Sequence, residues 1–184
     1  DGAGNGARRP HDDLNMTKAA IRQARTAEDI ATARDMFREY QVWLGVDLCF
    51  QDFDSELANL PGVYVPPRGE IYIAAAGDDV AGVVAVRPVS DGLDGRSEVK
   101  RLYVREGWRG QGLGRALADA AVSFATHAGY TTMVLDTLPH LVTARDMYAR
   151  MGFKEIVPYY ENPLPDVVYM EKILNTSGND KAEP

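Results

Sequence analysis

The sequence predicts a mixed α/β domain, built from one sheet with helices on its faces. In three segments apolar residues recur at three- and four-residue steps, as on one face of a helix, whereas other short runs are apolar and rich in β-branched residues, as in strands. The predicted order is a strand, two helices, an antiparallel series of strands, and then helix, strand, helix and closing strands. A chain of 184 residues with 45% hydrophobic residues is long enough to bury one such core.

The first part of the domain is expected to form a strand and two helices. Ala19–Arg25 predicts a short strand, and Thr26 followed by Asp29 resembles a helix-capping arrangement. Gly45 is expected to end the first helix, and Phe53–Leu60 predicts the second. The apolar face of the first helix would carry Ile30, Ala33, Phe37, Tyr40 and Leu44.

The middle of the chain is expected to form three strands. Glu70–Ala76 and Val80–Arg87 are apolar runs separated by Gly77-Asp78-Asp79, which predicts a hairpin. Ser97–Arg105 is a third run of this kind. The prolines of Val63–Gly69 place a loop before the hairpin.

Two helices and two further strands are expected after that. Strands are predicted at Thr131–Leu138 and Val167–Leu174, and the helices are expected to end at Gly129 and Gly152. The apolar positions of the two helices are Leu113, Leu117, Ala120, Ala121 and Phe124 in one and Ala144, Met147, Tyr148 and Met151 in the other.

Polar segments without periodicity flank this domain. Residues 1–18 predict a flexible N-terminal extension and residues 175–184 a polar C-terminal tail. Met16 stands where a natural start could lie, so residues 1–15 are left out of the fold prediction. The domain is therefore expected to span residues 19–174.

The composition argues against several functional classes. Lys and Arg total 20 and Asp and Glu total 27, and a net charge of −7 is unfavourable for general nucleic-acid binding. The longest apolar runs, such as Val80–Val86, are too short to span a bilayer, and the start of the chain lacks an apolar signal core. The single Cys49 suits a reducing compartment. We therefore expect a cytoplasmic protein that binds neither nucleic acid nor membranes.

The charge is distributed unevenly along the chain. Arg96–Arg115 contains six basic and two acidic side chains, a net charge of +4, so the remaining residues carry −11. A basic segment inside an acidic chain indicates a local anionic ligand, whereas the alternative is a solvated basic face.

The most informative segment is 99–117, where a strand leads through a glycine-rich turn into an amphipathic helix. The first N–H groups of a helix lack acceptors within it, and the helix dipole adds about half a positive charge there, so the turn can bind an anion. A dinucleotide fingerprint is excluded because its third glycine position holds Arg115, and a P-loop because the chain has Gly-Arg-Ala instead of Gly-Lys-Ser/Thr. The pattern that fits is Arg-x-x-Gly-x-Gly, at Arg109, Gly112 and Gly114.

This pattern, after a strand ending in Leu-Tyr-Val, resembles motif A of the GNAT superfamily of N-acetyltransferases, whose loop wraps the pyrophosphate of coenzyme A. A second segment, Ala144-x-x-Met147-Tyr148-x-x-x-Gly152-Phe153, is similar to a later helix of that superfamily. Leu141 departs from the family, which often has Asn at the start of this helix. Three further strings, Ser-Glu-Val-Lys-Arg-Leu-Tyr-Val, Leu-Asp-Thr-Leu-Pro and Pro-Tyr-Tyr-Glu-Asn-Pro, are similar to a bacterial GNAT subgroup of unknown substrate.

The resemblance implies a GNAT-type fold and a cosubstrate. The sheet would be mixed, mostly antiparallel and twisted, with helices on both faces, and it would splay near Val104 to admit acetyl-CoA. Arg101 and Arg105 are expected to face solvent instead, and Trp108 is expected to pack beside the loop. The residues expected to bind acetyl-CoA are Leu102, Val104, Arg109, Gly110, Gln111, Gly112, Gly114 and Arg115.

The resemblance also assigns two catalytic residues. Glu98 is expected to act as the general base that deprotonates the amine, directly or through water; the alternative is a structural ion pair with Lys100 on the same strand face. Tyr148 is expected to protonate the leaving thiolate; the alternative is that it only belongs to the apolar stripe of its helix. The predicted reaction is transfer of the acetyl group to a primary amine in a ternary complex, and the alternative is a non-catalytic acyl-CoA-binding or regulatory module.

The acceptor and the assembly are less defined by the sequence. A small-molecule amine or a peptide amine would both suit the reaction, and a homodimer is the commonest closed assembly. No metal is predicted, because His11, His127 and His140 lack ligand spacing and Cys49 has no partner His. The residues expected around the acceptor are Tyr40, Trp43, Asp47, Phe50, Asp52 and Asp54, with Tyr159, Tyr160 and Asn162 from a later loop.

Overall fold

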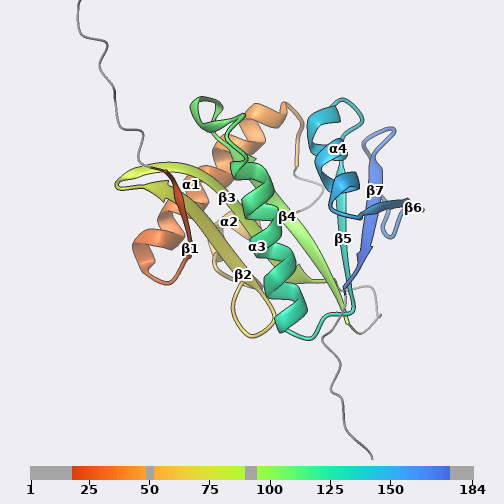
Figure 1. Ribbon diagram of the computed structural model, residues 1–184, viewed down its shortest axis with the longest axis horizontal. Helices are drawn as coiled ribbons and strands as arrows, with labels where there is room; N and C mark the ends of the chain where they lie inside the picture. Colours follow the sequence, from red (N-terminus) through yellow and green to blue (C-terminus); the bar gives the residue numbers. More distant parts are fainter. Residues whose placement is uncertain (1–17, 49–51, 90–94, 175–184) are drawn as a thin grey trace, which may run out of the picture.

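The computed structural model describes residues 18–48, 52–89 and 95–174. Figure 1 shows the arrangement of its helices and strands. In chain order the elements are β1 (Ala20–Gln23), α1 (Ala27–Leu44), α2 (Phe53–Asn59), β2 (Glu70–Ala76), β3 (Asp79–Pro88), β4 (Arg96–Val104), the 3₁₀ turn η2 (Glu106–Trp108), α3 (Leu113–His127), β5 (Thr132–Thr137), α4 (Val142–Arg150), β6 (Lys154–Ile156) and β7 (Val168–Ile173).

Seven strands form a single sheet in the order β1-β2-β3-β4-β5-β7-β6. Each neighbouring pair is antiparallel except β4 and β5, which are parallel because α3 crosses over between them. In Figure 1, α3 and α4 lie in front of the sheet and α1 and α2 lie behind it. The predicted mixed, mostly antiparallel sheet with helices on both faces is confirmed.

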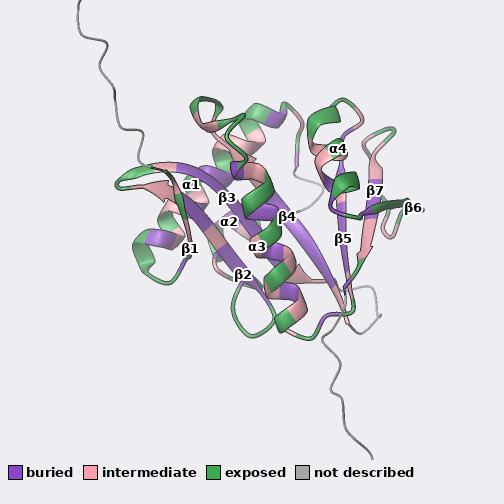
Figure 2. Cartoon of the chain, in the orientation of Figure 1, coloured by how far each residue is buried: buried purple, intermediate pink, exposed green. Residues whose placement is uncertain are grey.

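Each face of the sheet has its own hydrophobic core. The core under α3 and α4 contains Val84, Leu117 and Tyr148, and the core under α1 and α2 contains Phe37 and Val83. Val83 and Val84 are neighbours that point to opposite faces, as the two-residue period of a strand requires. Figure 2 shows the result, with the central strands buried almost throughout and the outer sides of the helices exposed.

Local sequence patterns account for the ends of the first helix. The Thr26 side chain accepts a hydrogen bond from the Asp29 N–H at 3.1 Å, and the Asp29 carboxylate accepts one from the Thr26 N–H at 2.9 Å, so the predicted capping box is confirmed. Gly45 ends α1 with φ +70°, a left-handed conformation that glycine adopts at little cost. The expected hairpin and the two later helices are also present; β6 had no predicted range.

The sheet splays between its two parallel strands. β4 pairs with β5 only over Arg96–Glu98 against Thr132–Val134, so the remainder of β4 has no ladder partner on that side within the described chain. A β-bulge against β3 adds to the divergence, because two residues, Arg101 and Leu102, lie opposite one. Arg101 has φ +58° at this bulge. The opening that results lies at the centre of the sheet.

Among the helices of the described ranges, none is long and apolar enough to cross a membrane.

Candidate active site

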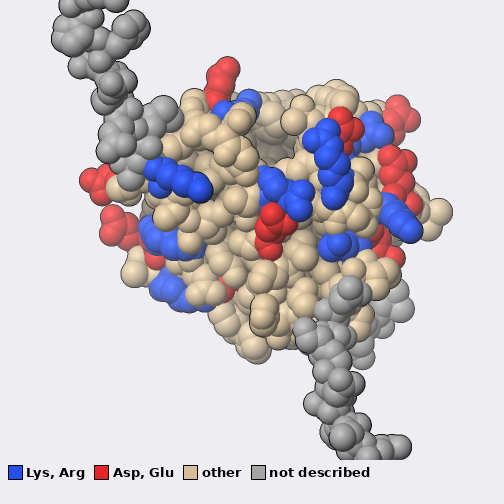
Figure 3. Space-filling model, viewed as in Figure 1, with Lys and Arg blue, Asp and Glu red and all other residues tan. Residues whose placement is uncertain are grey.

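A glycine-rich turn connects β4 to α3 beside the splay. Gly110 and Gly112 have φ +76° and +78°, and a Cβ atom at either position would have no neighbouring atom within 4 Å. Gly112 is the N-cap of α3 and makes no side-chain cap, so the first N–H groups of the helix face open space. Figure 3 shows the surface hollowed between this turn and α4. The turn is therefore open in the way that the predicted anion site requires, and it is called the anion cradle below; that it binds an anion stays a prediction.

Most of the basic segment 96–115 is neutralised by carboxylates from distant parts of the chain. Arg101 is buried and binds Glu56 of α2 through two hydrogen bonds of 3.1 and 2.6 Å, so the expectation that Arg101 faces solvent is wrong. Arg105 binds Glu39 in the same way at 2.9 and 2.6 Å. The other ion pairs of this segment are Arg96 with Glu171, Lys100 with Asp136 and Glu98, and Arg115 with Asp119.

Arg109 is the basic residue of this segment that has no carboxylate partner among the described residues. Its guanidinium carbon lies 4.7 Å from the centre of the Trp43 ring and 5.8 Å from that of Tyr103, and its Nε donates to the Val104 carbonyl at 2.9 Å. The positive charge is thus held beside the turn by aromatic rings rather than cancelled by an acid.

The remaining residues predicted to bind acetyl-CoA surround the same turn. Gln111 is exposed and donates to the Gly107 carbonyl at 3.4 Å. A Cβ on Gly114 would lie 3.8 Å from the Val104 side chain and 4.0 Å from the Met147 sulfur. Leu102 and Val104 are half-buried on the part of β4 that lies beyond its pairing with β5.

Glu98 lies at the base of the splay and is almost fully buried. Its Oε2 accepts from Arg87 at 2.8 Å, and its Oε1 accepts from the Tyr159 hydroxyl at 2.8 Å and lies 3.4 Å from the Lys100 Nζ. Burial alone would raise the pKa of this carboxyl, but the charges of Lys100 and Arg87 and the Tyr159 hydrogen bond together hold the pKa below its usual value. Glu98 is therefore an ionised carboxylate with both oxygens engaged.

Lys100 extends this network to β5. Its Nζ lies 3.1 Å from Asp136 Oδ1, and Asp136 also accepts a hydrogen bond from the Tyr160 hydroxyl. Asn162 donates to Tyr160 at 2.8 Å. The late loop and the two splayed strands are thus connected by one set of ion pairs and hydrogen bonds.

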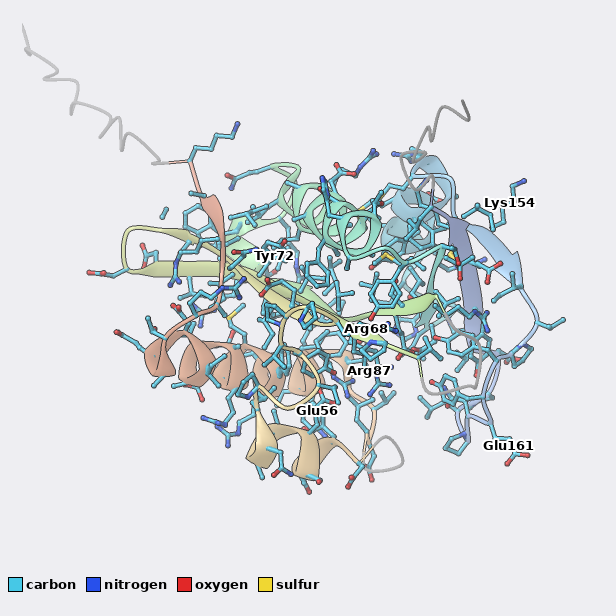
Figure 4. The ribbon with its side chains drawn as sticks, turned by 90° about the horizontal axis from the view of Figure 1, so that it is seen from below. Glu56, Arg68, Tyr72, Arg87, Lys154 and Glu161 are labelled. Atoms are coloured by element: carbon cyan, nitrogen blue, oxygen red, sulfur yellow. The ribbon has the colours of Figure 1, made fainter. Side chains whose placement is uncertain are left out.

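A second ion pair, between Glu56 and Arg101, lies close to this network on the same face of the sheet. Figure 4 shows Glu56 on α2 and Arg87 on β3 on the side of the sheet that α1 and α2 cover. Glu56 binds Arg101 and also accepts a hydrogen bond from the buried Tyr64 hydroxyl at 3.0 Å. The charged side chains on this face of the sheet therefore neutralise one another in pairs.

Tyr148 approaches the splay from the opposite face. Its ring is buried and lies edge-on to Phe153, with the ring centres 5.4 Å apart, and its hydroxyl makes no hydrogen bond to the described residues. Burial raises the pKa of this hydroxyl, and Tyr40 and the charge of Asp136 raise it further. Tyr148 therefore stays protonated at neutral pH, with a free hydroxyl near the splay.

A pocket with about 420 Å³ of free space, part of it open to solvent, lies on the α1 side of the splay. The polar side chains in its wall come from α1, β4 and β5, so the pocket spans the point where the parallel strands separate. They are Tyr40, Lys100, Arg101, Asp136 and Thr137.

Of the described residues that were expected around the acceptor, one lines the pocket. Tyr40 lines the pocket, and burial raises the pKa of its hydroxyl to about 12. Trp43 supports Arg109 instead. Asp47, Asp52 and Asp54 are exposed and lie outside the pocket wall. Phe50, Cys49 and His11 lie outside the described residues.

Neither of the two described histidines, His127 and His140, lines the pocket at the splay. His127 is exposed near the end of α3, where its Nδ1 lies 2.7 Å from the Ser123 carbonyl oxygen. His140 is also exposed. Within the described residues no group of three or more His, Cys, Asp or Glu side chains could hold a metal ion.

Asp136 is a functional candidate that the sequence prediction did not select. The sequence carries a weak indication of it, because Asp136 is a charged residue inside the otherwise apolar or neutral run 132–138. The pair of Lys100 with Glu98 is the local alternative that the sequence offered, whereas the contacts of Lys100 with Asp136 and of Arg87 with Glu98 join different strands and could not be identified from local patterns.

Comparison with known proteins agrees with this geometry. The family model described as "Acetyltransferase (GNAT) family" matches residues 27–153. An uncharacterized N-acetyltransferase of Schizosaccharomyces pombe is 41% identical over 158 residues, covering 85% of this chain and 96% of its own. Because that relative is eukaryotic, the expected bacterial subgroup is not confirmed.

Solved structures share the fold. An acetyltransferase from Streptococcus agalactiae has a TM-score of 0.70 and 23% identity, and covers 86% of this chain and 100% of its own. An acetyltransferase from Salmonella typhimurium, solved with acetyl-CoA, has a TM-score of 0.67 and 19% identity, and covers 91% and 98%. The family match and the yeast relative together show that the chain belongs to the acetyltransferase (GNAT) family.

Proposed function

We propose that this protein transfers the acetyl group of acetyl-CoA to a primary amine by direct attack in a ternary complex. The observation that carries the proposal is the position of the splay, which connects the anion cradle and Tyr148 to a polar pocket on the other face of the sheet. The yeast relative named as an N-acetyltransferase and the Salmonella structure that holds acetyl-CoA support it.

The residues of the turn fit the anionic part of acetyl-CoA. Gly110 and Gly112 leave open the space that a Cβ would fill, and the uncapped start of α3 offers N–H donors to a pyrophosphate. Arg109 would add a positive charge, and Arg115 would contribute after partial release from Asp119. The free edge of β4 at Leu102 and Val104 would take the pantetheine arm.

When bound, acetyl-CoA supplies the acetyl group as a thioester, whose carbon–sulfur bond breaks as the carbon–nitrogen bond forms. Glu98 would accept the amine proton through an intervening water, because both of its oxygens are engaged and it does not line the pocket. Its lowered pKa keeps it ionised at neutral pH. Tyr148 would give the proton of its free hydroxyl to the leaving sulfur.

A non-catalytic acyl-CoA-binding module is the alternative. It is not favoured, because such a module needs the cradle but has no use for a buried Tyr148 whose hydroxyl makes no hydrogen bond to the described residues.

Two measurements test the proposal together. Calorimetry should show that acetyl-CoA binds with a dissociation constant on the order of micromolar, and a thiol-release assay over a panel of primary amines should identify a substrate. A protein that does not bind acetyl-CoA would contradict both functions. Binding without release of thiol for any amine would favour the non-catalytic module.

A further inference from the structure

We infer that the amine acceptor is a small monoamine with an apolar body, bound in the pocket on the α1 side with its amino group at Asp136. The inference rests on the proposed function and names its substrate class.

The wall of the pocket combines aliphatic side chains with the five polar ones named above. Six aliphatic side chains, from α1 and the segment after it, from both splayed strands and from the late loop, surround the space. This aliphatic part of the wall stabilises an apolar ligand body and offers a second charged group no partner. These side chains are Leu44, Leu48, Val99, Leu138, Leu141 and Leu164.

Asp136 is the charged wall residue that a ligand can reach best. Its side chain is 16% exposed, compared with 5% for Lys100 and 3% for Arg101. Asp136 already accepts from Lys100 at Oδ1 and from the Tyr160 hydroxyl, and a carboxylate has about four acceptor sites, so it can take a further donor. An amino group entering the pocket would therefore meet Asp136 as its hydrogen-bond acceptor.

The fixed charges around the pocket cancel. Three cations, Arg87, Lys100 and Arg101, are bound to three carboxylates, Glu98, Asp136 and Glu56. A diamine would place its second ammonium group against leucines without a free carboxylate, and an amino acid would bring a carboxylate to cations that already have partners. Both carry a desolvation cost that a monoamine avoids.

The Lys100 ammonium offsets the effect of Asp136 on the protonation of the bound amine. It lies 3.1 Å from Asp136 Oδ1, so an amine at Asp136 would lie close to a fixed positive charge. The Asp136 carboxylate alone favours the ammonium form of the amine, and the like charge of Lys100 opposes this, so the amine gives up its proton and becomes the nucleophile more readily than beside an unpaired carboxylate. Asp136 would orient that amine toward the splay, on whose other face Tyr148 lies.

A matched series of amines tests the inference. Pentylamine, 1,5-diaminopentane and norleucine have comparable hydrocarbon chains, and the last two add one ammonium and one carboxylate respectively. At saturating acetyl-CoA we expect kcat/KM for pentylamine to exceed that for each of the others by about ten-fold or more. A lysine-containing peptide is expected to be acetylated no faster than the diamine.

A pocket variant provides an independent readout. Leu141→Ala enlarges the pocket, so it should move the preferred monoamine from pentylamine toward heptylamine with KM for acetyl-CoA unchanged. Val142→Ala is the matched control, because this neighbouring side chain is 56% exposed and lies outside the pocket wall.

The outcomes separate the two proposals. Equal or greater kcat/KM for the diamine, norleucine or the peptide would overturn the monoamine inference while leaving acetyl transfer intact. An unchanged chain-length preference in Leu141→Ala would overturn the assignment of the pocket. Failure to bind acetyl-CoA at all would overturn the proposed function itself.

Discussion

The guanidinium carbon of Arg109 lies 4.7 Å from the centre of the Trp43 ring, so a side chain of α1 supports the turn that forms the anion cradle. Trp43 is 43% exposed and also packs on Tyr103, with ring centres 5.7 Å apart. This contact explains why a ring as large as that of Trp43 is partly exposed. It keeps the Arg109 charge close to the cradle without neutralising it.

We predict that Trp43→Ala weakens acetyl-CoA binding. A cation–π contact of this kind is worth about 0.5–2 kcal/mol, so KM for acetyl-CoA should rise about 2- to 30-fold while kcat changes little. Trp43→Phe should recover part of the loss. Val42→Ala is the control, because the Val42 side chain is 81% exposed on the same helix. If KM is unchanged in Trp43→Ala, Arg109 does not depend on this ring.

A substitution at Gly112 should affect both stability and binding. Alanine at φ +78° costs about 1–2 kcal/mol, and its Cβ would enter the space proposed for the pyrophosphate. Gly129→Ala is a strain-matched control at the other end of α3, with φ +84° and no atom within 4 Å. We expect the two variants to lose similar stability in thermal melts, and only Gly112→Ala to lose acetyl-CoA affinity in calorimetry. Equal affinities would place the anion elsewhere.

Elements that depend on neighbouring residues could be predicted from the sequence. The capping box of Thr26 and Asp29 and the hairpin around Gly77 require only local contacts and periodicity, and both are present. The Arg109–Gly114 turn has the left-handed glycines that its pattern implies.

Features that depend on distant contacts could not be predicted in this way. The basic segment suggested an anion-binding surface, but Arg101 and Arg105 are bound to Glu56 and Glu39, which come from helices far earlier in the chain. Glu98 does pair with Lys100, as the structural alternative held, and its role as a base remains a prediction. A single acid in an apolar strand does not indicate a site, so Asp136 could not be selected from the sequence. Its role depends on the splay that exposes it.

We predict that Glu98→Gln lowers kcat most at low pH. The free amine is scarcest there, so proton removal matters most, and the variant should approach the wild type as the pH nears the amine pKa of about 10. Because the pKa of Glu98 is below its usual value, the wild-type profile should show no inflection from this group between about pH 5 and 9. A variant with an unchanged pH profile of kcat would exclude Glu98 as the base.

Loss of Glu98 also leaves Arg87 without its carboxylate partner, so stability must be followed in the same experiment. Removing one member of a buried ion pair typically costs about 3–5 kcal/mol. Tyr159→Phe is a milder companion, because it removes one hydrogen bond of 2.8 Å and leaves the charge of Glu98 in place. Its melting temperature should fall less, and its pH profile should keep the wild-type shape.

Tyr148→Phe is predicted to lower kcat by about 100-fold with little change in KM for acetyl-CoA or in stability. The hydroxyl makes no hydrogen bond to the described residues, so the folded protein loses little when it is removed, whereas the leaving sulfur loses its proton donor. Burial raises the pKa of this hydroxyl, so the wild-type rate should not fall through loss of the acid up to about pH 10. Tyr72→Phe, which removes a hydroxyl on β2, is the matched control and should keep wild-type turnover. Full turnover by Tyr148→Phe would show that the sulfur leaves without this acid.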